Sequence, residues 1–324
     1  MYFVGVDAGG TKTAFVLTDE NGRVLARHRS GRGAFLSEGS EGLRSLLAQG
    51  IGELCRRAGI SPEDITFAGL GFPGYGEQEG SEDEILAACE SVIGPGRVRC
   101  DCDCYLGWAG SLGMEPGVNI VAGTGAICYG VNEAGDTARS SGWGAYCDEG
   151  SCRWVGERLI QTFTKQSDGR MPRTMLYEMF REENGLRDDL HFIGRLNHVL
   201  GGDGAKVAEF QLLADKIALA GDPAALAIYR EAAEELAVAA AAVAKKLGMG
   251  EGHRVSYSGG LFRSGALILE PLEKLICDQG GVLTAPRFSP ELGAVLIAMR
   301  GADPGRDFGE FAFTEMKEES TDEQ

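Results

Sequence analysis

The chain has 324 residues, of which 44 % are hydrophobic and 24 % charged, and this composition is typical of a globular protein. That length allows about two domains, each with its own core. The 31 basic and 48 acidic residues give a net charge of −17, which disfavours binding to nucleic acid or to an anionic membrane. No basic leader and no apolar stretch of membrane-spanning length is present, so we expect a cytoplasmic protein.

The first third of the chain alternates strands and helices. Three short apolar runs predict a strand meander, and the turn signal Glu20-Asn21-Gly22 lies between the second and third. Apolar residues at helical spacing and further apolar runs then predict a helix, a strand, a second helix and a strand that ends near Asp103. The expected elements are 2–6, 14–18, 23–27, 43–58, 66–70, 82–92 and 97–104.

The pattern of the first strands returns later in the chain. Gly10-Thr11 precedes Gly22 by 12 positions, and Gly123-Thr124 precedes Gly135 by the same 12. Strand, Gly-Thr loop, strand and Gly turn therefore recur together at an offset of 113, with the second set of strands expected at 119–122 and 126–131. We interpret this as an internal duplication that produces two similar domains.

The rest of the chain is first helical and then mixed. Residues 152–248 have helical patterns throughout, including the Ala-rich 223–247, and no catalytic residue is expected there. The expected elements after it are a strand at 253–257, a loop at 258–260, a helix at 264–277, a strand at 282–285 and a helix at 289–300 that packs back on the first domain. In the acidic tail after Asp307, residues 314–324 have the composition of a solvated, disordered end.

Nine cysteines without a C-x-x-C zinc pair indicate buried thiols in a reducing compartment. If 97–104 is one strand, Cys100, Cys102 and Cys104 share one of its faces. Metal binding by this row stays open, but ligands spaced along one strand fan out, so small core residues are the favoured interpretation.

The segment Asp7-Ala8-Gly9-Gly10-Thr11-Lys12-Thr13 lies between two predicted strands. Its glycines allow backbone N–H groups to face a phosphate, Thr11 adds a hydroxyl, and Asp7 suits water-mediated Mg²⁺ binding. The Walker spacing is absent, and an ordinary Gly-rich hairpin explains this loop equally well. The matching Gly123-Thr124-Gly125 loop favours phosphate binding.

These motifs occur in an order and spacing that resembles the sugar kinase, heat-shock protein 70 and actin superfamily. Within it, the chain is similar to the N-acetylglucosamine kinase and BadF/BcrA-type ATPase branch, above all to bacterial N-acetylmuramate/N-acetylglucosamine kinases. The resemblance covers nearly the whole chain. The matching pieces are 7–13, 69–74, 121–125, 142–144, 148–151 and 258–262.

The resemblance implies an α/β fold of two actin-like, ribonuclease H-like domains with a central ATP and substrate cleft. The expected N-terminal domain is 1–115 plus 289–303. The expected C-terminal domain is 116–288 with a helical insertion at about 152–248, followed by an acidic tail at 304–324. Homodimers are common among similar kinases.

The resemblance also assigns roles to residues. Asp103 corresponds to the carboxylate that accepts the proton of the attacking sugar hydroxyl, whereas Asp101 does not align, and a helix N-cap is the alternative role for Asp103. Asp7 would bind Mg²⁺ through water molecules. The sugar would contact Gly74, Asp103, Gly142, Trp143, Gly144 and Asp148, and ATP would contact Gly9, Gly10, Thr11, Lys12, Gly123, Thr124, Gly125, Gly259 and Gly260.

The implied activity is ATP- and Mg²⁺-dependent phosphorylation of a hexose derivative, such as N-acetylglucosamine or N-acetylmuramic acid. Three departures leave the sugar open: Ala34 replaces a usual Asn, Ala126 replaces a usual Ser, and the connection at 145–147 is one residue short. The loss of polar partners reduces discrimination between sugars.

Two alternatives remain. One is an ATPase that drives a partner enzyme, as activators of 2-hydroxyacyl-CoA dehydratases do. Those proteins have an iron–sulfur cysteine where this chain has Ile120. The other is a sugar-responsive regulator or binding protein without turnover, although the first strand begins at residue 2 and leaves no room for a DNA-binding module before it.

Overall fold

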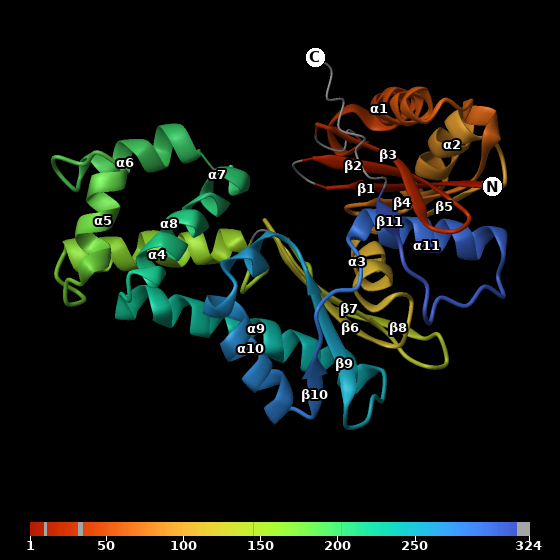
Figure 1. Cartoon of the computed structure of the whole chain (residues 1–324). Helices are drawn as coiled ribbons and strands as arrows, with labels where there is room; N and C mark the ends of the chain where they lie inside the picture. Colours follow the sequence, from red (N-terminus) through yellow and green to blue (C-terminus); the bar gives the residue numbers. More distant parts are fainter. Residues whose placement is uncertain (10–11, 32–34, 145, 202, 316–324) are drawn as a thin grey trace, which may run out of the picture. The chain divides into compact units, whose positions relative to one another are not determined.

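The computed structural model describes residues 1–9, 12–31, 35–144, 146–201 and 203–315. The chain forms two compact units. Unit 1 comprises Met1–Glu115 and Pro286–Gln324, and unit 2 comprises Pro116–Ala285. Each contains one β-sheet with helices packed on it (Figure 1). No helix in the described part of the chain is long and apolar enough to cross a bilayer.

The sheet of unit 1 has six strands in the order β11-β3-β2-β1-β4-β5. β1 pairs antiparallel with β2 and parallel with β4, so the meander of the first three strands continues into a parallel half. The strands are β1 Tyr2–Ala8, β2 Thr13–Asp19, β3 Arg23–Ser30, β4 Ile65–Phe72, β5 Val98–Cys102 and β11 Thr314–Glu315.

Helices cover both faces of this sheet because the side chains of β1 alternate. Val4 and Val6 pack with α1 and α2, and Phe3 packs with α11 on the opposite face. Figure 1 shows α1 on one side and α11 on the other. The helical elements of unit 1 are α1 Phe35–Ala58, the short η1 Pro62–Asp64, α2 Ser81–Ile93, α3 Asp103–Leu112 and α11 Pro290–Ala302.

Glycines in the central strands allow α11 to lie directly on the sheet. A Cβ on Gly5 would come within 2.2 Å of the Glu291 carbonyl oxygen, and one on Gly69 within 2.1 Å of the Ala294 carbonyl oxygen. Only glycine fits this approach. The expected packing of the last long helix on the first domain is thereby confirmed, and its first turn lies near the end of β1.

The C-terminal segment differs from the sequence-based expectation. Phe308 is buried in the core beneath α11, and β11 pairs with β3. The expected disorder at 314–324 is therefore wrong for Thr314 and Glu315, because the preceding Phe308, Phe311 and Phe313 anchor this segment. These rings contact one another edge to face.

The sheet of unit 2 has five strands in the order β10-β9-β6-β7-β8. β6 pairs antiparallel with β7 and parallel with β9, which repeats the arrangement around β1. The duplication seen in the sequence is thus a duplication of structure. The strands are β6 Gly117–Ala122, β7 Ala126–Val131, β8 Thr137–Ser141, β9 His253–Ser258 and β10 Gly281–Leu283.

Helices make up most of unit 2, as the sequence predicts for 152–248. The Ala-rich α9 packs on β6, β7 and β8, and a cluster of phenylalanine rings on α4, α5, α6 and α8 fills the core between those helices. The helical elements are α4 Cys152–Ser167, α5 Met175–Glu183, α6 His191–Arg195, η2 Leu196–Leu200, α7 Gly204–Ala208, α8 Phe210–Leu219, α9 Pro223–Lys246, η3 Gly260–Ser264 and α10 Ala266–Asp278.

Candidate active site

Unit 1 places Asp7 near the end of β1, just before the first Gly-rich loop. The loop closes with a hydrogen bond of 2.9 Å from the Gly9 backbone N–H to the Lys12 carbonyl oxygen. Burial and the negative charges of Asp103 and Glu291 raise the pKa of Asp7 to about 7, against a smaller lowering by Lys12. Gly10 and Thr11 lie outside the described residues.

Asp103 is the first residue of α3, directly after β5, and Cys102 is the N-cap. The N-cap alternative for Asp103 is therefore not the structure observed. The side chain is partly buried, and burial together with the charge of Glu77 raises its pKa to about 6, although a backbone hydrogen bond from Cys104 opposes the rise. At neutral pH this carboxyl is deprotonated and still weakly basic, which suits proton acceptance from a hydroxyl.

Neighbouring Asp101 accepts the Cys102 backbone N–H at 2.9 Å. This bond to the adjacent backbone gives Asp101 a structural partner at the end of β5. Asp101 is not among the charged residues that shift the pKa of Asp7.

The three cysteines do not share one strand face, because the strand stops at Cys102 and Cys104 lies on α3. The Sγ atoms of Cys102 and Cys104 are 2.9 Å apart, whereas Cys100 is buried against the core of α1 and α2. No group of three or more His, Cys, Asp or Glu side chains in the described residues could hold a metal ion. The cysteines are therefore small packing residues, two of which flank Asp103.

Glu291, in the first turn of α11, was not among the sequence candidates. Its carboxylate pairs with Arg27 at 3.0 Å, and Arg27 also bonds to Glu315 of β11 at 2.6 Å. Arg27 thus links the start of α11 to the C-terminal strand. No local motif marks Glu291, because its place beside Asp7 depends on a helix about 280 residues further along the chain.

In unit 2, the second Gly-rich loop connects β6 and β7. The Gly123 N–H donates to the Gly125 carbonyl oxygen at 2.9 Å, and the Gly123 carbonyl accepts from the Cys152 N–H at 2.8 Å. A Cβ on Gly125 would lie 2.7 Å from Asp148 Oδ2. Thr124 is exposed, so its hydroxyl is available to a ligand.

Asp148 holds the following glycine loop in shape. One carboxylate oxygen accepts the N–H groups of Trp143 at 2.9 Å and Gly144 at 3.1 Å. Burial raises the pKa of Asp148, against the lowering effect of these bonds. Asp148 Oδ1 is thereby occupied by the protein itself, while the indole of Trp143 is 79 % exposed. The backbone runs through positive φ at Gly142 and Gly144.

The remaining candidate loops contain one glycine that the fold requires. Gly259 has φ 110°, and a Cβ there would come within 2.3 Å of the Ala122 carbonyl oxygen. The Gly259 loop therefore packs against the end of β6, next to the loop at 123–125. At Gly260 a Cβ would meet nothing closer than Cys152 Sγ at 3.8 Å. Gly74, after β4, turns with φ 75°.

The carboxylate pair in unit 1 fits a hard divalent cation. Asp7 and Asp103 repel one another, and a bound cation would relieve that repulsion through oxygen ligands. Mg²⁺ is usually bound by one or two carboxylates and retains several water molecules, so it does not need a closed cage of protein ligands.

Each unit thus has an α/β sheet that begins with an antiparallel meander and carries a Gly-rich loop after its first strand, and this is the fold of actin-like sugar kinases. The chain belongs to the BadF/BadG/BcrA/BcrD ATPase family, whose model matches residues 4–298.

Individual relatives agree with this placement. The chain is 28 % identical over 314 residues to an N-acetyl-D-glucosamine kinase of Dictyostelium discoideum, covering 92 % of this chain and 97 % of that one. It is 29 % identical to an N-acetylmuramic acid/N-acetylglucosamine kinase of Clostridium acetobutylicum, with coverages of 76 % and 81 %. A solved structure from Chromobacterium violaceum, assigned as an N-acetylglucosamine kinase, matches with a TM-score of 0.74 and 26 % identity over 92 % of this chain and 98 % of that chain. The fold and family expected from the motifs are confirmed.

Proposed function

We propose that this protein is an ATP-dependent kinase that phosphorylates a hydroxyl group of a hexose derivative, an amino sugar of the N-acetylglucosamine or N-acetylmuramic acid type. The observation that carries the proposal is Asp103, a partly buried carboxyl at a strand end whose pKa is raised to about 6. Membership of the family and similarity to amino-sugar kinases along most of the chain support it.

In the proposed reaction, Asp103 accepts the proton of the attacking sugar hydroxyl while that oxygen bonds to the γ-phosphorus of ATP and ADP leaves. Phosphoryl transfer of this kind depends mainly on positioning and charge stabilisation. Backbone N–H groups of the Gly-rich loops would contact the phosphates. The residues proposed for ATP are Gly9, Gly10, Thr11, Lys12, Gly123, Thr124, Gly125, Gly259 and Gly260, and those proposed for the sugar are Gly74, Asp103, Gly142, Trp143, Gly144 and Asp148.

Asp7 is the proposed residue for Mg²⁺. When bound, Mg²⁺ would supply neutralisation of the phosphate charge. The raised pKa of Asp7, caused by burial and by two neighbouring carboxylates, supports a site that gains from a cation.

The partner-driving ATPase is the second candidate, and one residue argues against it. Ile120 is fully buried within β6, where those activators have a cluster-binding cysteine. Anaerobically purified protein that is brown and absorbs at about 400 nm would favour that activity. A binding protein without turnover is the third candidate.

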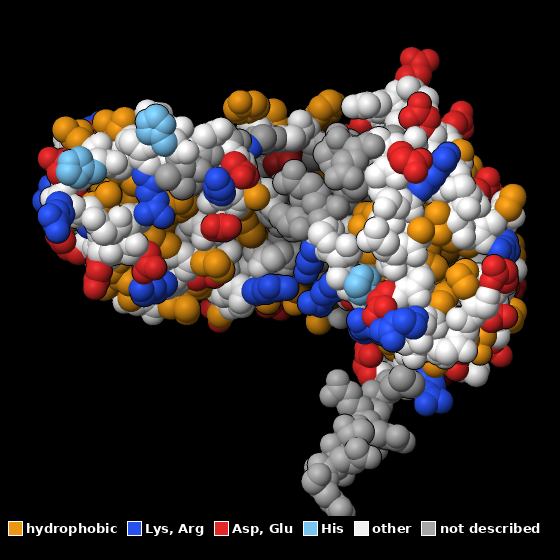
Figure 2. All heavy atoms as spheres, turned by 90° about the horizontal axis from the view of Figure 1, so that it is seen from above, with side chains coloured by type: hydrophobic (Ala, Val, Ile, Leu, Met, Phe, Trp, Pro, Cys, Tyr) orange, Lys and Arg blue, Asp and Glu red, His pale blue; other side chains and the backbone are white. Residues whose placement is uncertain are grey.

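The proposal includes a cytoplasmic location and no binding to nucleic acid or membranes. The net charge of −17 supports this part. On the face in Figure 2, Lys and Arg side chains are interspersed with Asp and Glu. Homodimers are common among similar kinases, and gel filtration with light scattering tests whether this chain forms one.

The test is ADP release from Mg-ATP with N-acetylglucosamine, N-acetylmuramic acid, glucosamine, N-acetylmannosamine, N-acetylgalactosamine or glucose. Release that depends on a sugar supports the kinase, whereas equal release without sugar supports the partner-driving ATPase. Asp103→Asn should reduce turnover by at least about a hundredfold while ATP binding by calorimetry is retained. Unchanged turnover of this variant would exclude Asp103 as the base.

A further inference from the structure

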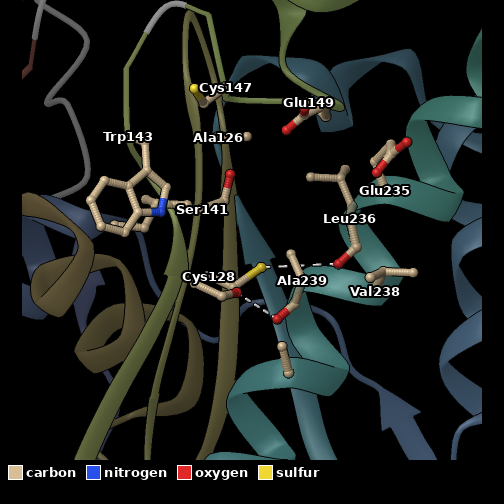
Figure 3. A pocket seen from close by; sticks show the side chains of 13 residues that line it. Ala126, Cys128, Ser141, Trp143, Cys147, Glu149, Glu235, Leu236, Val238 and Ala239 are labelled. Atoms are coloured by element: carbon tan, nitrogen blue, oxygen red, sulfur yellow. Dashed lines mark hydrogen bonds between the residues drawn. The ribbon is translucent and has the colours of Figure 1, made fainter.

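A pocket of about 270 Å³ lies within unit 2, between the edge of the sheet and α9. One wall comes from β7, β8 and the loop after β8, and the other comes from α9. Figure 3 shows Trp143 on one side of this pocket and Glu235, Leu236 and Val238 on the other. The proposed function uses Trp143 but gives no role to α9.

The wall that carries Trp143 is held in a strained backbone conformation. Ser141 has φ 59°, which is rare for a residue other than glycine and costs about 1–2 kcal/mol. Gly142 follows with φ 71°, and its N–H bonds to the Ala126 carbonyl oxygen at 2.9 Å. Asp148 fixes the next two N–H groups. Strain and three hydrogen-bonded N–H groups thus present an indole that is 79 % exposed, which is the arrangement of a ligand contact rather than of a core residue.

The floor of the pocket is small and apolar. Ser140 Oγ already donates to the Ala239 carbonyl oxygen at 2.6 Å, so Ser140 offers no free donor. The apolar residues of the lining are Ala126, Ile127, Leu236, Val238, Ala239 and Ala242. Ala126 is one of the positions where this chain departs from amino-sugar kinases, and here the smaller, apolar residue faces the pocket.

The charge of the lining has one sign. Glu149 and Glu235 are its only charged residues, both are exposed, and neither has a hydrogen bond or ion pair with another described residue. An aromatic ring suits the apolar face of a pyranose or its substituent, and free carboxylates accept from hydroxyl or ammonium groups. Two carboxylates beside the same cavity repel a third.

We propose that this pocket is the subsite that selects the acceptor by its substituent, admitting neutral or ammonium-bearing substituents and excluding acidic ones. The inference rests on the proposed function. Trp143 packs against the sugar, and Glu149 and Glu235 set the charge that the subsite tolerates. Among amino sugars, glucosamine and N-acetylglucosamine fit this subsite. N-acetylmuramic acid has a carboxylate, which the carboxylates of Glu149 and Glu235 would repel.

The test compares Glu149→Gln and Glu235→Gln with Glu234→Gln. Glu234 is exposed on the same helix but does not line the pocket, so its variant makes the same charge change elsewhere. For each variant, kcat/KM is measured with glucosamine, N-acetylglucosamine and N-acetylmuramic acid. Glu149→Gln and Glu235→Gln should each raise the ratio of kcat/KM for N-acetylmuramic acid to kcat/KM for N-acetylglucosamine by about three- to tenfold. Each should lower the ratio of kcat/KM for glucosamine to kcat/KM for N-acetylglucosamine by a similar factor.

These changes should appear in KM for the sugar and not in KM for ATP, which separates selection from a general loss of activity. The glutamine variants keep the side-chain shape, and thermal unfolding shows whether they fold. Ratios that stay the same in Glu149→Gln and Glu235→Gln as in Glu234→Gln would overturn the proposal. So would a wild-type preference for N-acetylmuramic acid.

A failure of the proposed function is distinguishable from a failure of this inference. If no sugar stimulates ADP release by the wild-type protein, the kinase proposal fails. Calorimetry of glucosamine binding without ATP then tests whether the pocket is a sugar subsite. Glucosamine binding that weakens at least about threefold in Glu149→Gln and Glu235→Gln but not in Glu234→Gln would still support the subsite. No binding of glucosamine to the wild type would refute it.

Discussion

Replacing Asp103 with asparagine should stabilise the protein while it removes the proposed base. The pKa of this carboxyl is raised from 3.8 to about 6, chiefly by burial, so the folded state binds its proton more tightly than the unfolded state does. The free energy of unfolding therefore falls as pH rises from about 3.8 to about 6, and above pH 6 the full cost of the buried charge is present. Asparagine has no charge and avoids this cost.

The size of the effect follows from the pKa shift. A difference of about 2.2 units at about 1.36 kcal/mol per unit gives a gain of about 3 kcal/mol for Asp103→Asn at pH 8. At pH 5 the folded carboxyl is mostly protonated, so the gain should shrink to about half. The repulsion between Asp103 and Asp7 disappears in the same variant, and this adds to the gain.

Urea unfolding followed by circular dichroism, with EDTA and without nucleotide, measures this difference at the two pH values. Glu79→Gln is the matched control, because Glu79 is exposed in the same unit and its loss of charge should change stability by less than about 0.5 kcal/mol. The reasoning is refuted if Asp103→Asn leaves stability unchanged or lowers it at pH 8. It is also refuted if the gain is as large at pH 5 as at pH 8.

Four further substitutions test the packing and the glycine loop. Gly69→Ala would place a Cβ 2.1 Å from the Ala294 carbonyl oxygen and should lower the free energy of unfolding by about 3 kcal/mol, whereas Gly52→Ala meets nothing within 4 Å and should raise it by up to about 1 kcal/mol, both measured by urea unfolding. Phe308→Ala should cost about 3–5 kcal/mol in the same assay, and a cost below 1 kcal/mol would mean that the C-terminal segment does not contribute to the core. Asp148→Ala leaves two backbone N–H groups without their acceptor, so KM for the sugar should rise at least about tenfold with little change in KM for ATP, and equal rises in both would contradict a local role.

The sequence predicted the two sheets well because each depends on local patterns. Apolar runs, Gly turns and helical spacing are visible within short windows, and the recurrence at an offset of 113 marked the second meander. Both meander turns indeed use positive φ, 81° at Gly22 and 84° at Gly135. Local patterns failed where one residue changes the element, as at Asp103, which starts a helix instead of ending a strand.

Residues that reach the candidate site from far along the chain could not be predicted in this way. Glu291 and Arg27 form an ion pair because Gly5 and Gly69 allow α11 to pack directly on the sheet. Glu235 is one of several similar glutamates on α9, and nothing in its neighbourhood distinguishes it from Glu234. A three-dimensional structure is needed to see which of such residues face a cavity or another carboxylate.

Each unit has features that violate local rules at its strand ends and beside its Gly-rich loop. Ser141 adopts a positive φ without being glycine, Asp7 lies beside Asp103 and Glu291 with the same charge, and Trp143 exposes an indole. Each is unfavourable for folding alone and would be removed by selection for stability only. Their positions at the strand ends and beside the Gly-rich loop of each unit are the physical reason to place ligand binding and chemistry there.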